Sequence, residues 1–166
     1  DVDLIVLSGD VTNTGSVTEG REFEKLFAPL LRKLVIVPGN HDRGTNDYAS
    51  RVTRQRVWVR QATGLYFICA DSTQPLSTAT FLAHGCVTQQ DIEQITEAAR
   101  AAPPKDFVGL ILHHHLFEAR PDSLGEAAAD AFKLPFSAPL DGGRELLAPC
   151  LYARTLPWRC RCRSRK

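Results

Sequence analysis

The chain has 166 residues, the usual size of one domain, and 43% of them are apolar, which is enough to build a hydrophobic core. Its formal net charge is +1, and no run reaches the roughly 18 consecutive apolar residues that a membrane span needs. The five cysteines are odd in number and scattered, so they predict no disulfide framework, and we expect a reduced, cytoplasmic chain without a membrane partner.

Strand-like and helix-like segments alternate through the first part of the chain. Residues 4–8 form a continuous apolar run, as expected for a strand that is buried on both faces. Residues 34–37 repeat this pattern. Residues 17–33 have the apolar spacing of an amphipathic helix, carried by Phe23, Leu26, Phe27, Leu30 and Leu31. Residues 47–61 mix Arg with Val, which fits either a helix or a substrate-side loop.

The alternation continues in the second part. Strands are predicted over residues 65–70 and 108–112, and a helix over residues 88–101. Thr88 suits the N-cap of that helix, and Asp91 suits the reciprocal position of a capping box. Residues 116–140 lack a clear periodicity, and residues 140–153 fit a last helix. This order of elements predicts a layered α/β domain.

Polar clusters follow three of the apolar runs. Asp10 comes after the first run, Gly39-Asn40-His41-Asp42 after the second, and His113-His114-His115 after the last. In α/β sheets, ligands bind beyond the carboxyl ends of the strands. Each cluster alone has another explanation, because Gly-Asp is a common turn and a strand-end histidine is often structural. The three together favour a metal site that contains Asp10, Asn40 and one of the histidines.

In this order the clusters resemble the motif blocks of the calcineurin-like metallophosphoesterases. Gly9-Asp10 with Gly15 is similar to the second block of that family, Gly39-Asn40-His41-Asp42 to the third, and the triple histidine to the fourth. The resemblance covers roughly residues 3–118. It implies an αββα sandwich, in which helices flank two packed sheets, here incomplete, and it implies a metal-dependent phosphoesterase.

The resemblance also implies roles for individual residues. Two divalent ions (Mn, Fe or Zn) would neutralise the phosphoester charge and turn a bound water into hydroxide. Asp10 would bridge the two ions, and Asn40 would supply a neutral ligand. His41 would contact the substrate phosphate or protonate the leaving oxygen. Asp42 would hold the other imidazole nitrogen of His41, as carboxylates around metal sites often do.

The strand period and the family pattern bear on the choice among the three histidines. Side chains alternate along a strand, so His113 and His115 share one face while His114 takes the other. Related sequences place the ligand two residues before a proline, and Leu116 stands at the position of that proline. This registration favours His114 as the metal ligand, with His113 as the alternative.

Two motif blocks of the family have no match in the chain. No Asp-x-His precedes Gly9, and no Gly-His-x-His follows His115. We therefore expect residues 1–150 to form part of a catalytic domain with little activity by itself. The expected substrates are small phosphodiesters, either cyclic nucleotides or glycerophosphodiesters. The alternatives are a non-catalytic binding protein and an inactive fragment on the same fold.

The last 16 residues differ in charge from the rest. Residues 151–166 contain six basic residues and no acid, which leaves 14 basic against 19 acidic residues in residues 1–150. A basic tail can bind nucleic acid, but we expect a disordered or non-native end here and no nucleic-acid partner. His84 is expected on the surface, with a substrate contact as the alternative.

Overall fold

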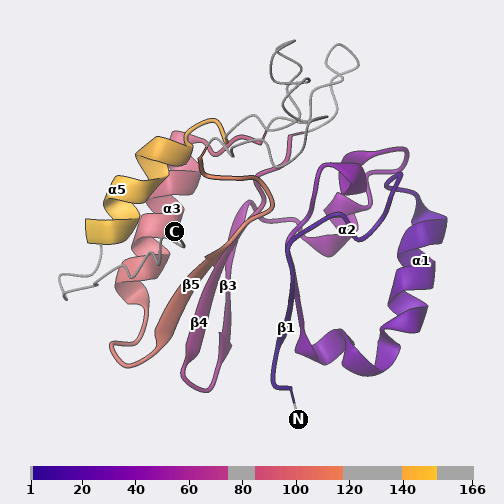
Figure 1. Cartoon of the computed structure of the whole chain (residues 1–166), viewed down its shortest axis with the longest axis horizontal. Helices are drawn as coiled ribbons and strands as arrows, with labels where there is room; N and C mark the ends of the chain where they lie inside the picture. Colours follow the sequence, from indigo (N-terminus) through magenta and orange to yellow (C-terminus); the bar gives the residue numbers. More distant parts are fainter. Residues whose placement is uncertain (1, 75–84, 118–139, 153–166) are drawn as a thin grey trace, which may run out of the picture.

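The computed structural model describes residues 2–74, 85–117 and 140–152. Two sheets form its centre (Figure 1). One sheet pairs strands β1 (Ile5–Leu7) and β2 (Leu34–Ile36) in parallel. The other has the order β3 (Val57–Ala62), β4 (Leu65–Ala70) and β5 (Phe107–Ile111), with β4 antiparallel to β3 and parallel to β5. The expected arrangement of two sheets with flanking helices is confirmed.

Helices α3 (Gln89–Ala101) and α5 (Gly143–Tyr152) lie together beside the three-stranded sheet (Figure 1). Their contact with it forms the larger core, which combines alternate side chains of β4 with one stripe of α3. The buried members are Tyr66, Ile68, Ala70, Val87, Ile92, Ile95, Ala99, Ala102, Leu140 and Leu146. The α3 members Ile92, Ile95 and Ala99 have the i, i+3, i+7 spacing of one helix face, which packs on the sheet.

A second, smaller core lies between the two sheets. Its buried members are Val35 and Val37 from the β2 region, Cys69 from β4 and Ile111 from β5. Burial raises the pKa of the Cys69 thiol to about 12, so this side chain packs as a neutral apolar group. This core joins the strand ends of both sheets, and the loops beyond those ends meet on one side of the molecule.

Helix α1 (Val17–Leu26) begins at a capping box formed by Ser16 and Glu19. Hydrogen bonds, first from the Thr14 hydroxyl, lower the pKa of Glu19 to about 2. The helix ends earlier than predicted, because Pro29 cannot continue it, and residues Ala28–Lys33 form the 3-10 helix η1. The predicted apolar stripe is therefore interrupted, and Leu26 remains 78% exposed.

The undecided region over residues 47–61 contains two elements. A short helix, α2 (Ala49–Val52), comes first, and β3 then starts at Val57. A tight turn at Thr63-Gly64 joins β3 to β4, with Gly64 at a φ of +74°. A left-handed φ suits glycine in hairpin turns. The strand β3 was missed because its outward residues Arg60 and Gln61 interrupt the apolar pattern.

The other predicted elements lie within one to three residues of their expected ends. The capping box of Thr88 and Asp91 is confirmed at the start of α3. His84, the basic tail from residue 153 and most of the segment over residues 116–140 lie outside the described residues. No helix in the described part of the chain is long and apolar enough to cross a membrane.

Replacing Ile95 with Ala should lower the free energy of unfolding by about 2–5 kcal/mol, because the side chain is fully buried between α3 and the sheet. Urea unfolding followed by circular dichroism measures this loss. Leu26→Ala is the matched control, since Leu26 is 78% exposed and should change stability by no more than about 0.5 kcal/mol. A similar loss in both variants would contradict the assigned core.

Candidate metal centre

Side chains from three loops meet where strands of both sheets end. Asp10 follows β1, Asn40 follows β2 and His113 follows β5. Nε2 of His113 lies 2.9 Å from Oδ1 of Asn40 and 3.5 Å from Oδ2 of Asp10. The three strand ends therefore converge as the sequence predicted, and they bring oxygen and nitrogen donors from two different sheets to one place.

Two glycines allow this close approach. Gly9 has a φ of +102°, and a Cβ placed on it would lie 2.5 Å from Nδ1 of His113. A Cβ on Gly39 would lie 2.1 Å from Oδ1 of Asp10. Asp10 itself has a φ of +54°, a left-handed conformation that short polar residues tolerate better than others. Side chains at positions 9 and 39 would displace two members of the cluster.

The contacts of His113 fix which ring nitrogen carries the proton. Nδ1 lies 2.7 Å from the backbone oxygen of Ser8, which can only accept, so Nδ1 is the donor. In the neutral ring Nε2 is then an acceptor, and it faces the acceptor oxygens of Asn40 and Asp10. Acceptors repel one another unless a positive charge lies among them. This arrangement of acceptors is of the kind that suits a divalent cation.

The structure places His113, and not His114, beside Asp10 and Asn40, and the choice of His114 as the metal ligand stays a prediction. The ring of His114 turns to the other side, where Nδ1 lies 2.8 Å from the Ser72 hydroxyl. A Cβ on Gly85 would lie 2.2 Å from that ring, so the two are in close contact. Strand β5 ends at Ile111, so the three histidines lie in the loop that follows it. The alternation of side chains along a strand therefore does not determine which way each histidine points.

His41 lies at the start of η2 (His41–Arg43) with its side chain exposed. Its backbone N–H donates to Oδ1 of Asp10 over 3.0 Å, and its ring Nδ1 lies 2.8 Å from the backbone oxygen of Asn13. Since that oxygen only accepts, Nδ1 carries the proton. Nε2 is left for an external group next to the cluster, which suits a role in proton transfer or phosphate contact.

Asp42 has a different task from the predicted one of orienting the His41 ring, because that ring is held by Asn13. The Asp42 carboxylate is fully buried and accepts from the Thr12 N–H over 2.9 Å, the Thr12 hydroxyl over 2.7 Å and the Gly39 N–H over 2.9 Å. It joins the loop after β1 to the loop after β2. Asp42 therefore fixes the backbone that carries Asp10 and Asn40.

The donor set fits one divalent ion. A carboxylate, an amide oxygen and a neutral imidazole nitrogen suit Zn²⁺, Mn²⁺ or Fe²⁺, and three protein ligands leave positions open as catalytic metal sites require. Among the described residues, no group of three or more His, Cys, Asp and Glu side chains could hold a metal ion. The cluster contains only two residues of these types, Asp10 and His113, together with the amide of Asn40. These three side chains could supply ligands to one ion.

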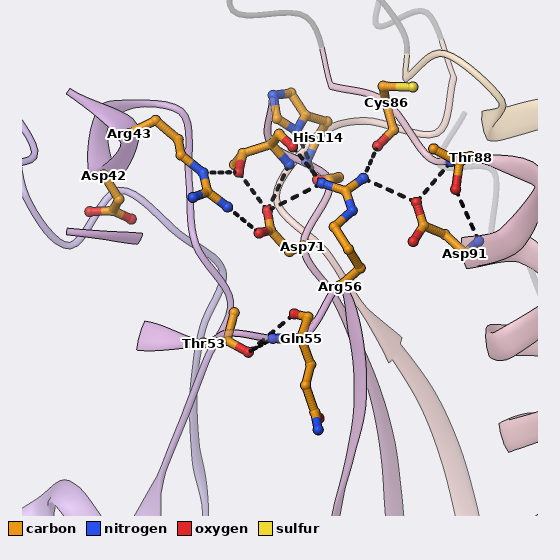
Figure 2. A network of polar contacts seen from close by, with 12 residues as sticks. Asp42, Arg43, Thr53, Gln55, Arg56, Asp71, Cys86, Thr88, Asp91 and His114 are labelled. Carbon is orange, nitrogen blue, oxygen red and sulfur yellow. Dashed lines mark hydrogen bonds and ion pairs between the residues drawn. The ribbon is translucent and has the colours of Figure 1, made fainter. Parts of the chain in front are cut away.

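Sequence reasoning missed a polar network beside the cluster (Figure 2). Arg43 pairs with Asp71, which follows β4 just as Asp10 follows β1, and with Asp47 over 2.9 Å. Burial acts to raise the pKa of Asp47, but the Ser50 hydroxyl and the Arg43 guanidinium outweigh it and hold that pKa below its ordinary value. An acidic residue directly after a buried strand was the signal that could have identified Asp71.

Comparison with known proteins supports the resemblance. The sequence model of the family described as calcineurin-like phosphoesterase matches residues 1–140. A probable cyclic nucleotide phosphodiesterase of Ruthia magnifica subsp. Calyptogena magnifica is 25% identical over 116 residues, which are 69% of this chain and 46% of that protein. Another, from Vesicomyosocius okutanii subsp. Calyptogena okutanii (strain HA), is 37% identical over 46 residues, 28% of this chain and 20% of that protein. The chain spans less than half the length of these curated relatives.

Replacing Asp42 with Ala should lower the free energy of unfolding by about 3 kcal/mol or more, because buried N–H groups of Thr12 and Gly39 lose their acceptor. Urea unfolding in EDTA measures this without a metal contribution. Asp10→Asn, at a more exposed carboxylate, should change stability by about 0.5 kcal/mol or less. Equal stability of the wild type and Asp42→Ala would contradict this structural role of Asp42.

The two neighbouring histidines should differ in their effect on metal binding. Nε2 of His113 lies beside Asn40, whereas Nδ1 of His114 lies beside Ser72, so His113→Ala should raise the Mn²⁺ dissociation constant more than His114→Ala does. The signal of free Mn²⁺ in electron paramagnetic resonance measures both constants. Residues around a metal site change affinity by about 10–100-fold, and His113→Ala should exceed His114→Ala within the same titration. The opposite order would make His114 the ligand.

Proposed function

The chain belongs to the calcineurin-like phosphoesterase family, and from this membership we propose that it carries the metal-binding part of a phosphodiesterase. The observation that supports the proposal is the convergence of three acceptors, from Asp10, Asn40 and His113, on one point beyond the strand ends. We assign these three residues as ligands of a divalent ion. When bound, the ion supplies Lewis acidity to the phosphoryl group and lowers the pKa of water.

A second ion is part of the proposal, with Asp10 as the bridge. The two oxygens of this carboxylate lie in different surroundings, since Oδ1 accepts from the His41 N–H and Oδ2 faces His113. A carboxylate has lone pairs enough to bind two ions and keep one hydrogen bond. The other ligands of a second ion would come from beyond the three residues of the cluster.

His41 is proposed as the residue that handles the proton of the leaving oxygen or contacts the phosphate. Its Nδ1 proton is held by Asn13, so any exchange with substrate takes place at Nε2. Its backbone is fixed to Asp10, which places the ring beside the proposed ligands rather than among them. A proton donor next to the leaving group assists departure of an alkoxide, which is a poor leaving group without protonation.

The proposed substrates are small phosphodiesters. Both curated relatives are named as probable cyclic nucleotide phosphodiesterases, and we extend that class to this chain, with glycerophosphodiesters as the alternative within it. A phosphodiester carries one negative charge, so its hydrolysis depends on cationic groups at the non-bridging oxygens.

In the complete protein, His41→Ala should reduce kcat for bis(p-nitrophenyl) phosphate by about 10²–10⁴-fold, the usual contribution of general acid–base catalysis, while bound Mn²⁺ is retained. Asp10→Ala should lose both hydrolysis and Mn²⁺. Release of p-nitrophenol and elemental analysis of the same samples separate the two effects. The monoester p-nitrophenyl phosphate serves as the substrate control and should be hydrolysed more slowly than the diester.

Two results would contradict this proposal. Sustained hydrolysis by Asp10→Ala would show that the cluster does not hold the catalytic ion. Loss of Mn²⁺ from His41→Ala, in proportion to the loss of rate, would make His41 a ligand and not a proton donor.

A further inference from the structure

The three residues that follow β4 are polar and yet buried. Asp71 is 3% exposed, and both Ser72 and Thr73 are 0% exposed. Residues 71–73 form what we call the 71–73 segment, which lies in the network of Figure 2. Polar side chains at this depth need partners with good geometry, so the contacts of the segment indicate what it holds in place.

On one side the 71–73 segment contacts the loop that follows β2. The Asp71 carboxylate pairs with Nη2 of Arg43, and the Thr73 hydroxyl accepts from Nε of Arg43 over 2.7 Å. Two donors of one planar guanidinium are thereby fixed, which sets its orientation as well as its position. Arg43 is the last residue of η2, the same turn that begins at His41 and follows Asn40 directly.

On the other side the segment holds the loop after β5. The Ser72 hydroxyl lies 2.8 Å from Nδ1 of His114, and the backbone at Gly85 closes against that ring. The rings of His114 and His113 meet edge to face, with 4.9 Å between their centroids. A displacement of His114 would therefore move the ring of His113, whose Nε2 belongs to the cluster.

The 71–73 segment is itself anchored to the helical layer through Arg56 (Figure 2). Nη1 of Arg56 donates to the Thr73 backbone oxygen over 2.6 Å, and Nη2 donates to Asp91 in the first turn of α3 over 3.0 Å. Burial acts to raise the pKa of Asp91, but the Arg56 hydrogen bond and the Thr88 cap outweigh it and keep that pKa below its ordinary value. Arg56 thus ties the segment to the first turn of α3.

We infer that the 71–73 segment is a positioning device for the metal centre: through Arg43 it sets the loop of Asn40 and His41, and through His114 it sets His113. The inference rests on the proposed metal site. A buried ion pair stabilises a fold little relative to apolar packing, because desolvation offsets the attraction. Such a pair has a clear use where it fixes the relation of two elements, and here those elements come from different sheets.

Two variants test the segment, one on each of its sides. Asp71→Asn keeps the shape but removes the charge that holds Arg43, and Ser72→Ala removes the hydroxyl that holds His114. Asp47→Asn is the first control, because Asp47 is the other, half-exposed partner of Arg43. Ile95→Val is the second control, because it weakens the core of α3 without contact to either loop.

Three measurements are made on each variant of the complete protein. The Mn²⁺ dissociation constant reports affinity, the visible absorption of bound Co²⁺ reports ligand geometry, and urea unfolding in EDTA reports the stability of the metal-free fold. We expect Asp71→Asn and Ser72→Ala each to raise the Mn²⁺ dissociation constant by about 10–100-fold, the range for residues that orient metal ligands, and to change the Co²⁺ spectrum. In both controls the Mn²⁺ dissociation constant should stay within about threefold of the wild-type value, and the Co²⁺ spectrum should be that of the wild type.

The outcomes separate this inference from a general loss of structure. Unchanged Mn²⁺ binding and an unchanged Co²⁺ spectrum in Asp71→Asn and Ser72→Ala would overturn it, as would an equal loss of affinity in Ile95→Val at equal loss of stability. If Asp71→Asn does not fold, Ser72→Ala decides. A wild-type protein that binds Mn²⁺ without hydrolysing phosphodiesters would contradict the proposed function. The Mn²⁺ dissociation constants of the variants would still show whether the 71–73 segment positions the metal site.

Discussion

The arrangement of the site depends on the buried carboxylate of Asp42. This group is 0% exposed, and such burial is tolerable only because Thr12 and Gly39 supply short hydrogen bonds from two directions. The donors lie on the loops that follow β1 and β2, which are neighbouring parallel strands. By satisfying both loops at once, Asp42 sets the distance between them. Asp10 and Asn40 are each attached to backbone that this carboxylate fixes.

Backbone contacts extend the junction of the two loops away from the cluster. The Thr45 N–H donates to the Thr14 oxygen over 2.6 Å, and the Tyr48 N–H donates to the Gly15 oxygen over 3.3 Å. A Cβ on Gly44 would lie 1.9 Å from the Thr14 oxygen, so the two backbones touch where only glycine fits. A loop that is bonded along its length has few alternative conformations, and the side chains at its edge are correspondingly well placed.

The elements that depend on local residue patterns were predictable from the sequence. The continuous apolar runs located four of the five strands in the described part of the chain, and Thr88 with Asp91 located the start of α3, because these signals need no knowledge of distant residues. The strand β3 was missed because it is an edge strand in which the exposed Arg60 and Gln61 interrupt the apolar pattern. The early end of α1 follows from Pro29 and was available in the sequence, yet the apolar stripe outweighed it.

For the site, residue types were predictable and their partners were not. The convergence of Asp10, Asn40 and one histidine followed from their places after strands. The choice between His113 and His114 required the path of the chain after β5, which depends on the Ser72 hydroxyl and on Gly85. In the same way, the burial of Asp42 depends on Thr12, which lies 30 residues away in the sequence. Contacts of this range leave no periodic signal.

Charge pairing around the loops engages the two arginines nearest to the cluster. Arg43 is the arginine nearest to the cluster in sequence, but its guanidinium pairs with Asp71 and Asp47. Arg56 is engaged in turn by Asp91 and by backbone oxygens. Both guanidinium groups thus form ion pairs with buried or half-buried carboxylates outside the cluster. Asp10 is left facing Asn40 and His113, and the network that braces the loops is the same one that keeps the nearby cations away from it.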